Sequence, residues 1–287
     1  MPALFISLLT LFLSLTSLNS YAVANPNNPP SINPSINTHT DYVGSDACGQ
    51  CHQTEFKQWQ TSHHAKAMML PSSVSVLGDF NNIDVDFNGV STRFTQQGDD
   101  YFITTQNAKG KTETFNVAYT FGYTPLQQYL INIGDGKLQA FDIAWDSRPK
   151  AEGGQRWFKL LPNEDTSPES PFHWTRHTQN WNSRCADCHS TNVSKNYDPI
   201  YERYNTTFNE ENVACESCHG SGQQHVSLVS SGTFKKETNN GFKTDLKQTR
   251  QFVMTENNSI AVPQGEKTAA QINACGGCHS RRQVIGE

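Results

Sequence analysis

Every cysteine in the chain belongs to one of four copies of the same short motif, Cys-x-x-Cys-His. In chain order, motifs 1 to 4 consist of Cys48, Cys51 and His52; Cys185, Cys188 and His189; Cys215, Cys218 and His219; and Cys275, Cys278 and His279. Two thiols at this spacing can add across the two vinyl groups of one porphyrin edge, and the next imidazole can bind the iron from the proximal side. The pattern is the attachment signature of c-type heme, so we predict four covalently bound hemes.

Two other readings of these cysteines are possible. Eight cysteines in an exported chain would usually indicate a disulfide framework, and two Cys-x-x-Cys pairs could close a tetrahedral zinc site. Neither explains why a histidine follows every pair, since only 10 of the 287 residues are histidine. Heme attachment explains the whole pattern. It also explains a composition poor in aliphatic and rich in aromatic residues, because porphyrins would supply part of the apolar core.

The histidines outside the motifs decide whether each heme iron has a second protein ligand or a vacant position. They are His39, His63, His64, His173, His177 and His225. Three places stand out: the pair His63 and His64 after a predicted helix over residues 54–62, His173 ahead of motif 2, and His225 behind motif 3. Imidazoles on both faces give the closed, low-spin iron of electron-transfer hemes. Each could equally be an ordinary surface residue, and Met68, Met69 and Met254 are weaker candidate ligands.

The first 41 residues predict export. An apolar run over residues 3–18 precedes Ala22-Val23-Ala24, which is the pattern of a signal peptide over residues 1–24. An uncleaved anchor is the alternative, although the run is short for a bilayer span of about 20 residues. Residues 25–41 are rich in Pro, Asn and Ser and predict a disordered leader. We therefore expect a periplasmic protein with no stable membrane span after cleavage.

Charge and hydropathy exclude several classes of protein. The formal net charge of −5 gives no sign of a nucleic-acid binder, which needs cations for the phosphates. A mean hydropathy of −0.62 excludes a polytopic membrane protein. The 16 Phe, 9 Tyr and 5 Trp are too many for a wholly disordered chain. Trp59, Trp174 and Trp181 could pack on porphyrin, and Arg281 and Arg282 could pair with heme propionates or stay solvated.

Residues 84–161 contain neither cysteine nor histidine and read as strands. The strand-like runs cover residues 91–95, 101–106, 112–118, 126–133, 138–145 and 157–161. Gly98-Asp99-Asp100, Lys109-Gly110-Lys111 and Gly134-Asp135-Gly136 are turn signals between them. We predict an α+β protein: a first heme module over 42–80, an inserted small antiparallel β module over 81–165, and heme modules two to four, of short helices and loops, over 166–287. The β module could be a docking surface or a lid.

The residues around the motifs resemble the cytochrome c-554 (cytochrome c-552/4 domain) group of multiheme cytochromes. The resemblance rests on Asp46-Ala47-Cys48, Trp59, Ser62-His63-His64-Ala65-Lys66-Ala67-Met68, His173-Trp174, Asn180-Trp181-Asn182-Ser183 and the segment 215–225. It implies that His64, rather than His63, is a distal heme ligand, and that His173 and His225 are ligands too; His177 matches no position. Similar proteins often continue with further motifs, which leaves open whether this chain is a truncated relative whose fourth heme lacks a ligand.

Three functions are compatible with these observations. The first is a respiratory electron carrier with bis-histidine hemes, working between a quinol-linked donor and a terminal reductase. The second is an oxidoreductase with one open heme acting on a small nitrogen or sulfur compound. The third is a non-catalytic interaction module. The absence of a Cys-x-x-Cys-Lys motif, and of an identifiable acid or base group, favours the carrier. Its partners would be redox proteins and not nucleic acid, and self-association is left open.

Overall fold

The computed structural model describes residues 34–36, 41–234, 239–246, 251–256, 259–264 and 269–280. The predicted signal peptide, most of the leader, His39, Arg281 and Arg282 lie outside the described residues. Among the helices within these ranges, none is long and apolar enough to cross a membrane. Short helices and a mainly antiparallel set of strands agree with the predicted α+β class.

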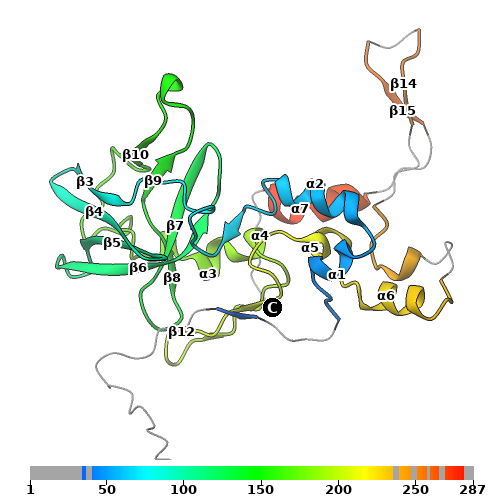
Figure 1. The fold of residues 1–287 in the computed structure, drawn as a ribbon, viewed down its shortest axis with the longest axis horizontal. Coiled ribbons are helices and arrows are strands. Elements are labelled where there is room, and N and C mark those ends of the chain that lie inside the picture. The colour runs from blue at the N-terminus through cyan, green and yellow to red at the C-terminus, as the bar shows by residue number, and fades with distance from the viewer. Residues whose placement is uncertain are drawn as a thin grey trace, which may run out of the picture. The chain divides into compact units, whose positions relative to one another are not determined.

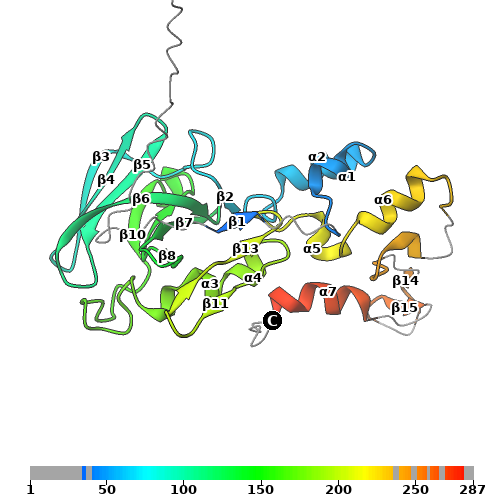
Figure 2. The same ribbon diagram turned by 90° about the horizontal axis from the view of Figure 1, so that it is seen from below.

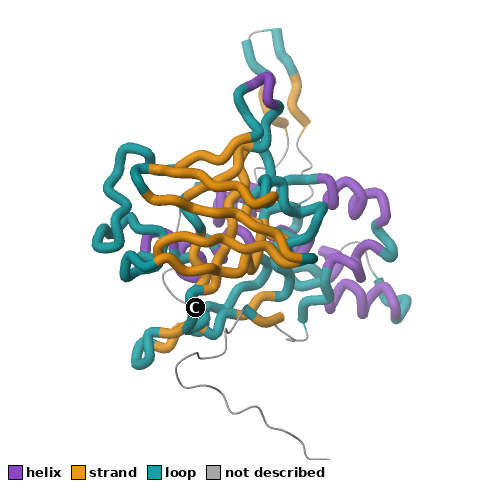
Figure 3. Tube along the Cα trace, turned by 60° about the vertical axis from the view of Figure 1, so that its left-hand side comes forward, coloured by secondary structure: helices purple, strands orange, loops and turns teal. Residues whose placement is uncertain are grey.

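The largest element is a nine-stranded sheet. Its strands are β2 (Met68–Met69), β3 (Asn81–Phe87), β4 (Val90–Gln97), β5 (Asp100–Gln106), β6 (Thr112–Phe121), β7 (Leu126–Asn132), β8 (Leu138–Ala140), β9 (Ile143–Asp146) and β10 (Arg156–Lys159). They follow the order β10-β9-β7-β6-β5-β4-β3, with β2 on β6 and β8 on β7 (Figure 1). All pairs are antiparallel, and Figure 3 shows the strands in orange.

The three turn signals connect neighbouring strands, as the sequence predicts. They join β4 to β5, β5 to β6, and β7 to β8. Gly136 is required by space as well as by its φ of +67°, because a Cβ there would lie 2.0 Å from the Tyr204 carbonyl oxygen. Two details differ from the sequence reading. Strand β3 was not expected, and the run over 138–145 is split into β8 and β9, since Phe141 and Asp142 take the chain from one end of β7 to the other.

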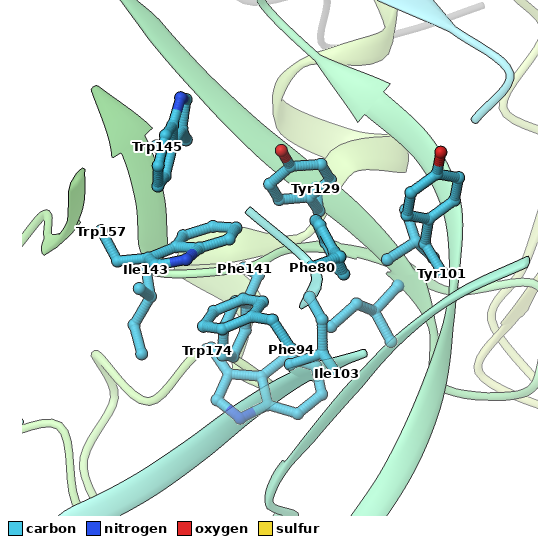
Figure 4. Packing of buried hydrophobic residues seen from close by; sticks show 12 residues of the cluster. Phe80, Phe94, Tyr101, Ile103, Tyr129, Phe141, Ile143, Trp145, Trp157 and Trp174 are labelled. Carbon is cyan, nitrogen blue, oxygen red and sulfur yellow. The ribbon is translucent and has the colours of Figure 1, made fainter. Parts of the chain in front are cut away.

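Aromatic side chains form the core of this sheet (Figure 4). Phe80 lies among the rings of Phe94, Tyr101, Tyr129 and Trp157 at centroid distances of 5.1 to 5.5 Å. Trp157 stacks on Phe94 at 3.6 Å. Each such pair contributes about 0.5–1.5 kcal/mol beyond the burial of its area. The sheet therefore has an apolar core of its own.

A second cluster joins the sheet to motif 2. Met68, Phe121 and Leu130 of the sheet pack with Trp181 and Ala186, which flank Cys185. Within the motif-2 region, the side-chain amide of Asn182 donates to the Gly136 carbonyl at 3.0 Å. These contacts connect one heme motif firmly to the β sheet.

The helices carry the motifs and bury few side chains (Figure 2). They are α1 (Ser45–Gly49), α2 (Gln53–Thr61), α3 (Trp181–Arg184), α4 (Ala186–His189), α5 (Cys215–His219), α6 (Gln223–Ser230) and α7 (Ala270–His279). Helices α2, α6 and α7 contain no buried residue, and α5 buries only Glu216. Helices this short are marginal without tertiary packing, so another group is needed to stabilise them.

Short strand pairs and 3₁₀ turns complete the motif-bearing part. The strand pairs are β1 (Ser35–Ile36) with β13 (Thr207–Phe208), β11 (Tyr197–Asp198) with β12 (Arg203–Tyr204), and β14 (Gln251–Val253) with β15 (Val262–Gln264). The 3₁₀ turns are η1 (Lys150–Glu152), η2 (His177–Gln179) and η3 (Asn239–Gly241).

Candidate heme-binding site

Each motif lies on a helical turn that brings its two thiols to one side. The N–H of Cys51 bonds to the Cys48 carbonyl at 3.2 Å, and that of Cys188 to the Cys185 carbonyl at 3.1 Å. Motif 3 forms α5, and motif 4 ends α7. Residues three apart on such a turn face the same way. The helical turn thus brings the two thiols of each motif next to one another and places the imidazole beside them.

The cysteines are in the state that heme attachment requires. All eight are free, and none forms a disulfide. No group of three or more His, Cys, Asp or Glu side chains within the described ranges has the arrangement of a metal site.

Thiol contacts between motifs reveal a spatial order that differs from the chain order. Cys48 of motif 1 is in hydrogen-bond contact with Cys215 of motif 3. Cys218 of motif 3 interacts with Cys275 of motif 4. Cys278 of motif 4 is in hydrogen-bond contact with Cys188 of motif 2, and its Sγ lies 4.0 Å from the Asp187 carbonyl. The Ser217 hydroxyl of motif 3 also lies 2.8 Å from the hydroxyl of Thr191, which follows motif 2. Motif 1 therefore adjoins motif 3, and motifs 2, 3 and 4 adjoin one another.

The motif-1 histidine faces a second histidine from α6. The ring centroids of His52 and His225 are 6.2 Å apart, with an angle of 35° between the planes. The ring of His225 is held from its other side by Phe242, which stacks on it at 4.8 Å. Gly241 allows the segment that carries Phe242 to lie this close to α6, because a Cβ at Gly241 would lie 2.9 Å from the backbone nitrogen of His225.

A hydrogen bond also sets the tautomer of His225. Its Nδ1 lies 2.7 Å from the carbonyl oxygen of Asn240. A carbonyl only accepts, so Nδ1 carries the proton and donates it, and Nε2 is left with a free lone pair. Metal-binding histidines are commonly oriented through such a bond to their second nitrogen. The geometry of His225 therefore suits an axial ligand.

The motif-4 histidine faces His64 in the same way. Their ring centroids are also 6.2 Å apart, with the planes at 68°. The backbone of His64 is fixed by Val213, whose N–H donates to the His64 carbonyl at 3.2 Å. Both histidines are exposed, but among the described residues His63 has no ring contact with a motif histidine. The structure thus brings His64, and not His63, to a heme motif.

Both pairs can be tested against the geometry of an iron between two imidazoles. Nitrogen–metal bonds of about 2 Å on each side place the two ring centres roughly 6 Å apart. The two observed separations match this value. The motif histidines of these two pairs, His52 and His279, are exposed. The donor set fits c-type heme, which when bound supplies reversible one-electron exchange between ferric and ferrous iron.

The histidines of motifs 2 and 3 have different surroundings. The ring of His189 packs against Phe121 at 4.4 Å, and its buried Nδ1 has no hydrogen-bond partner. Burial lowers its pKa. The pKa of His219 is lowered by burial and then by His52, and its ring lies 5.8 Å from that of Phe242. Neither ring contacts a second imidazole within the part of the chain that the structure describes.

The remaining candidate ligands lie apart from the motif histidines. His173 is buried with the sheet, where its Nδ1 bonds to the Thr175 hydroxyl at 2.8 Å and its ring packs on Trp174. His177 is exposed on η2. Met68 is fully buried in the second cluster, and Met254 is 63 % exposed. The structure thus gives His173 no motif histidine to face among the described residues.

The tryptophans singled out in the sequence also separate into different roles. Trp59 donates from Nε1 to the Val213 carbonyl at 2.9 Å, which ties α2 to the segment before motif 3. Trp174 belongs to the core of the sheet, and Trp181 to the cluster beside motif 2.

Sequence reasoning missed Asn240 and Phe242, which orient His225, because neither residue belongs to a recognisable motif.

Comparison with known proteins agrees with this site. The model of the family "Cytochrome c554 and c-prime" matches residues 47–86 and 145–220. Among solved structures, the outer cell wall cytochrome OcwA is similar at a TM-score of 0.43 and 19 % identity, over 67 % of this chain and 34 % of that one. An undecaheme cytochrome from the S-layer of Carboxydothermus ferrireducens is similar at a TM-score of 0.39 and 21 % identity, over 66 % and 22 %.

This chain spans about a third or less of the length of these two cytochromes. No curated protein matches the sequence. The family match covers the first three motifs and omits most of the sheet, from residue 87 to residue 144. Taken together with the four attachment motifs, this match identifies the chain as a multiheme c-type cytochrome.

Proposed function

We propose that this protein is a periplasmic tetraheme cytochrome that passes electrons between redox partners of a respiratory chain. The observation that carries the proposal is the pairing of a motif histidine with a second histidine at 6.2 Å in two separate places. Two imidazoles occupy both axial positions of an iron and leave none for a substrate. Such sites are suited to electron transfer and need no catalytic residue.

The order of the motifs supports a path through the protein. The thiol contacts place motifs 1 and 3, 3 and 4, and 4 and 2 side by side. In this path the cysteines anchor each ring edge, while His225 and His64 close the irons of motifs 1 and 4. A quinol-linked donor and a terminal reductase would then dock near different motifs.

Intact mass and electron paramagnetic resonance (EPR) test this proposal on the fully matured protein. We expect a mass that includes four hemes, and low-spin ferric signals from motifs 1 and 4 that added cyanide leaves unchanged. His64→Ala should convert one low-spin heme to high spin, whereas the matched variant His63→Ala should not. A mass without hemes would refute the proposal, as would a His64→Ala spectrum identical to the wild type.

An oxidoreductase with one open heme is the second candidate, and motif 2 favours it. The half-buried ring of His189 packs against Phe121, and no second imidazole contacts it within the described residues. An iron bound there by His189 alone would have a vacant position for a small ligand. The expected signature is a high-spin EPR signal that cyanide abolishes. If every signal is low-spin and insensitive to cyanide, this candidate is wrong.

A further inference from the structure

The side chain of Glu216, the second residue of motif 3, is buried between motifs 1 and 3. Its exposed fraction is 3 %. Its carboxylate oxygens accept hydrogen bonds from the backbone N–H groups of Val43 at 3.0 and 3.1 Å, Gly44 at 2.9 Å and Gly222 at 2.7 Å. Val43 and Gly44 lead into α1 and motif 1, and Gly222 follows motif 3. One carboxylate therefore joins the backbones beside both motifs.

A second carboxylate reinforces the same junction. Glu210 accepts hydrogen bonds at 3.2 Å from both the N–H and the hydroxyl of Ser45, the first residue of α1. The Ser45 hydroxyl in turn lies 3.4 Å from the backbone nitrogen of Cys215. Burial raises the pKa of Glu210. Motifs 1 and 3 are thus linked by two acidic side chains, Glu216 buried and Glu210 half-buried.

The charge of Glu216 is not balanced by a cation. Among the described residues, no lysine or arginine forms an ion pair with Glu216 or Glu210. The three backbone N–H groups stabilise the ionised carboxylate, but they do not cancel its net charge. In motif 2, by contrast, the acidic residue Asp187 is paired with Lys195 at 3.0 Å. The acidic residues of motifs 2 and 3 therefore differ in electrostatic environment.

We propose that Glu216 is a positioning residue whose buried negative charge lowers the reduction potentials of the hemes at motifs 1 and 3 below those at motifs 2 and 4. The inference rests on the proposed function. Ferric iron carries one more positive charge than ferrous iron, so a nearby anion stabilises the oxidised state. Burial strengthens this effect, because the interior screens charges less than water does.

The negative charges of Glu216 and Glu210 both act on Cys48 of motif 1. The pKa of the Cys48 thiol is raised by its hydrogen bond with Cys215, by burial, and by the charges of Glu216 and Glu210. Electrons move spontaneously from low to high potential. Electrons would accordingly enter at motifs 1 and 3 and leave through motifs 2 and 4.

The decisive experiment is a spectroelectrochemical redox titration of the heme-loaded protein with Glu216→Gln. Two of the four midpoint potentials should rise, by about tenfold in the redox equilibrium constant, which corresponds to about 59 mV for a one-electron couple. Glu55→Gln is the matched control, since Glu55 is an exposed carboxylate on α2, directly after motif 1. Its charge is screened by solvent, so the potentials should stay near those of the wild type.

A second variant separates tuning from mere structural support. Ser45→Ala removes the hydroxyl that links Glu210 to Cys215 but keeps both charges. It should lower the melting temperature without raising any potential. The inference is overturned if Glu216→Gln leaves all four potentials unchanged, or if Ser45→Ala shifts them equally. If Glu216→Gln does not load heme, Glu210→Gln must raise the same two potentials by a smaller amount, and its failure to do so overturns the inference.

The mass of the wild-type protein distinguishes a failure of the proposed function from a failure of the proposed role of Glu216. A wild-type chain without four hemes would refute the proposed function. A chain that carries four hemes, but whose potentials do not respond to Glu216→Gln, would refute only the tuning role of Glu216.

Discussion

Residues 81–159 bury a continuous cluster of aromatic side chains, whereas the helices that carry the heme motifs bury almost none. In the sheet, rings such as Phe94 and Trp157 pack directly on one another. Around motifs 1 and 3, the backbone is instead held by the buried carboxylate of Glu216 and the half-buried carboxylate of Glu210. The thiols there are free. The comparison teaches that the sheet can stabilise itself, while the motif-bearing helices depend on an added apolar group.

The largest effect should come from withholding heme. In a chain produced without heme attachment, we expect amide protection to persist in β3 to β10 and to be lost in α1, α2 and α5 to α7, since these short helices lack a core. Hydrogen exchange measured by mass spectrometry, with the heme-loaded protein as control, can locate the difference. Equal protection of both regions in the heme-free chain would contradict the comparison.

Removing a core ring should damage the sheet selectively. Trp157 contacts several aromatic rings and donates from Nε1 to the Asp79 carbonyl at 3.2 Å. Trp157→Ala should cost about 3–5 kcal/mol of unfolding free energy, measured by denaturant titration, with the heme spectrum unchanged. The control is Phe252→Ala, because Phe252 is 62 % exposed and its loss should be worth less than about 0.5 kcal/mol. A loss of heme in Trp157→Ala would show that the regions are coupled.

Titration of His173 should also make the free energy of unfolding of the sheet region depend on pH. Burial, followed by the charges of Arg176 and Lys159, lowers the pKa of His173 from 6.5 to about 4, and Glu169 acts in the opposite direction. The unfolded chain therefore binds more protons between these values. Stability is lost as pH falls through this window, by about 3 kcal/mol at most.

His173→Gln should flatten that pH dependence. The measurement is the unfolding free energy at several values between pH 4 and pH 7, with the exposed His177→Gln as control. Asp142 lies at the same cavity, and burial raises its pKa, so it opposes the His173 effect as the pH falls. The difference between wild type and His173→Gln isolates the histidine. An unchanged pH profile would show that His173 is not titrating in this window.

The smallest effect on stability should come from a distal histidine, with a clear spectroscopic change. His225→Ala removes the ring that faces His52. His225 lies on α6, a helix with no buried residue, so the unfolding free energy of the sheet should be unaffected. One low-spin EPR signal should become high-spin. Added imidazole should restore it, because the free ligand can occupy the vacated position. A spectrum insensitive to His225→Ala would remove this histidine from the ligand set.

Several elements of the sheet could be recognised from local sequence. The hairpins at Gly98, Gly110 and Gly134 follow from glycine-containing turns between alternating runs, and these are short-range features. Strand β3 was missed because Asn81-Asn82 and its alternating acidic residues resemble a loop. The division between β8 and β9 could not be foreseen either, since it depends on both segments pairing with β7.

The sequence by itself determined the heme chemistry, because attachment needs only two thiols and an imidazole within five consecutive residues. It also identified His64 and His225 as candidate ligands, through the resemblance of their surroundings. Only the tertiary structure decided which histidine faces which motif, that motif 1 adjoins motif 3 while motifs 2, 3 and 4 adjoin one another, and that His173 lies with the sheet. Those relations join residues far apart in the chain, so they depend on packing and on buried partners such as Glu216, which no local pattern encodes.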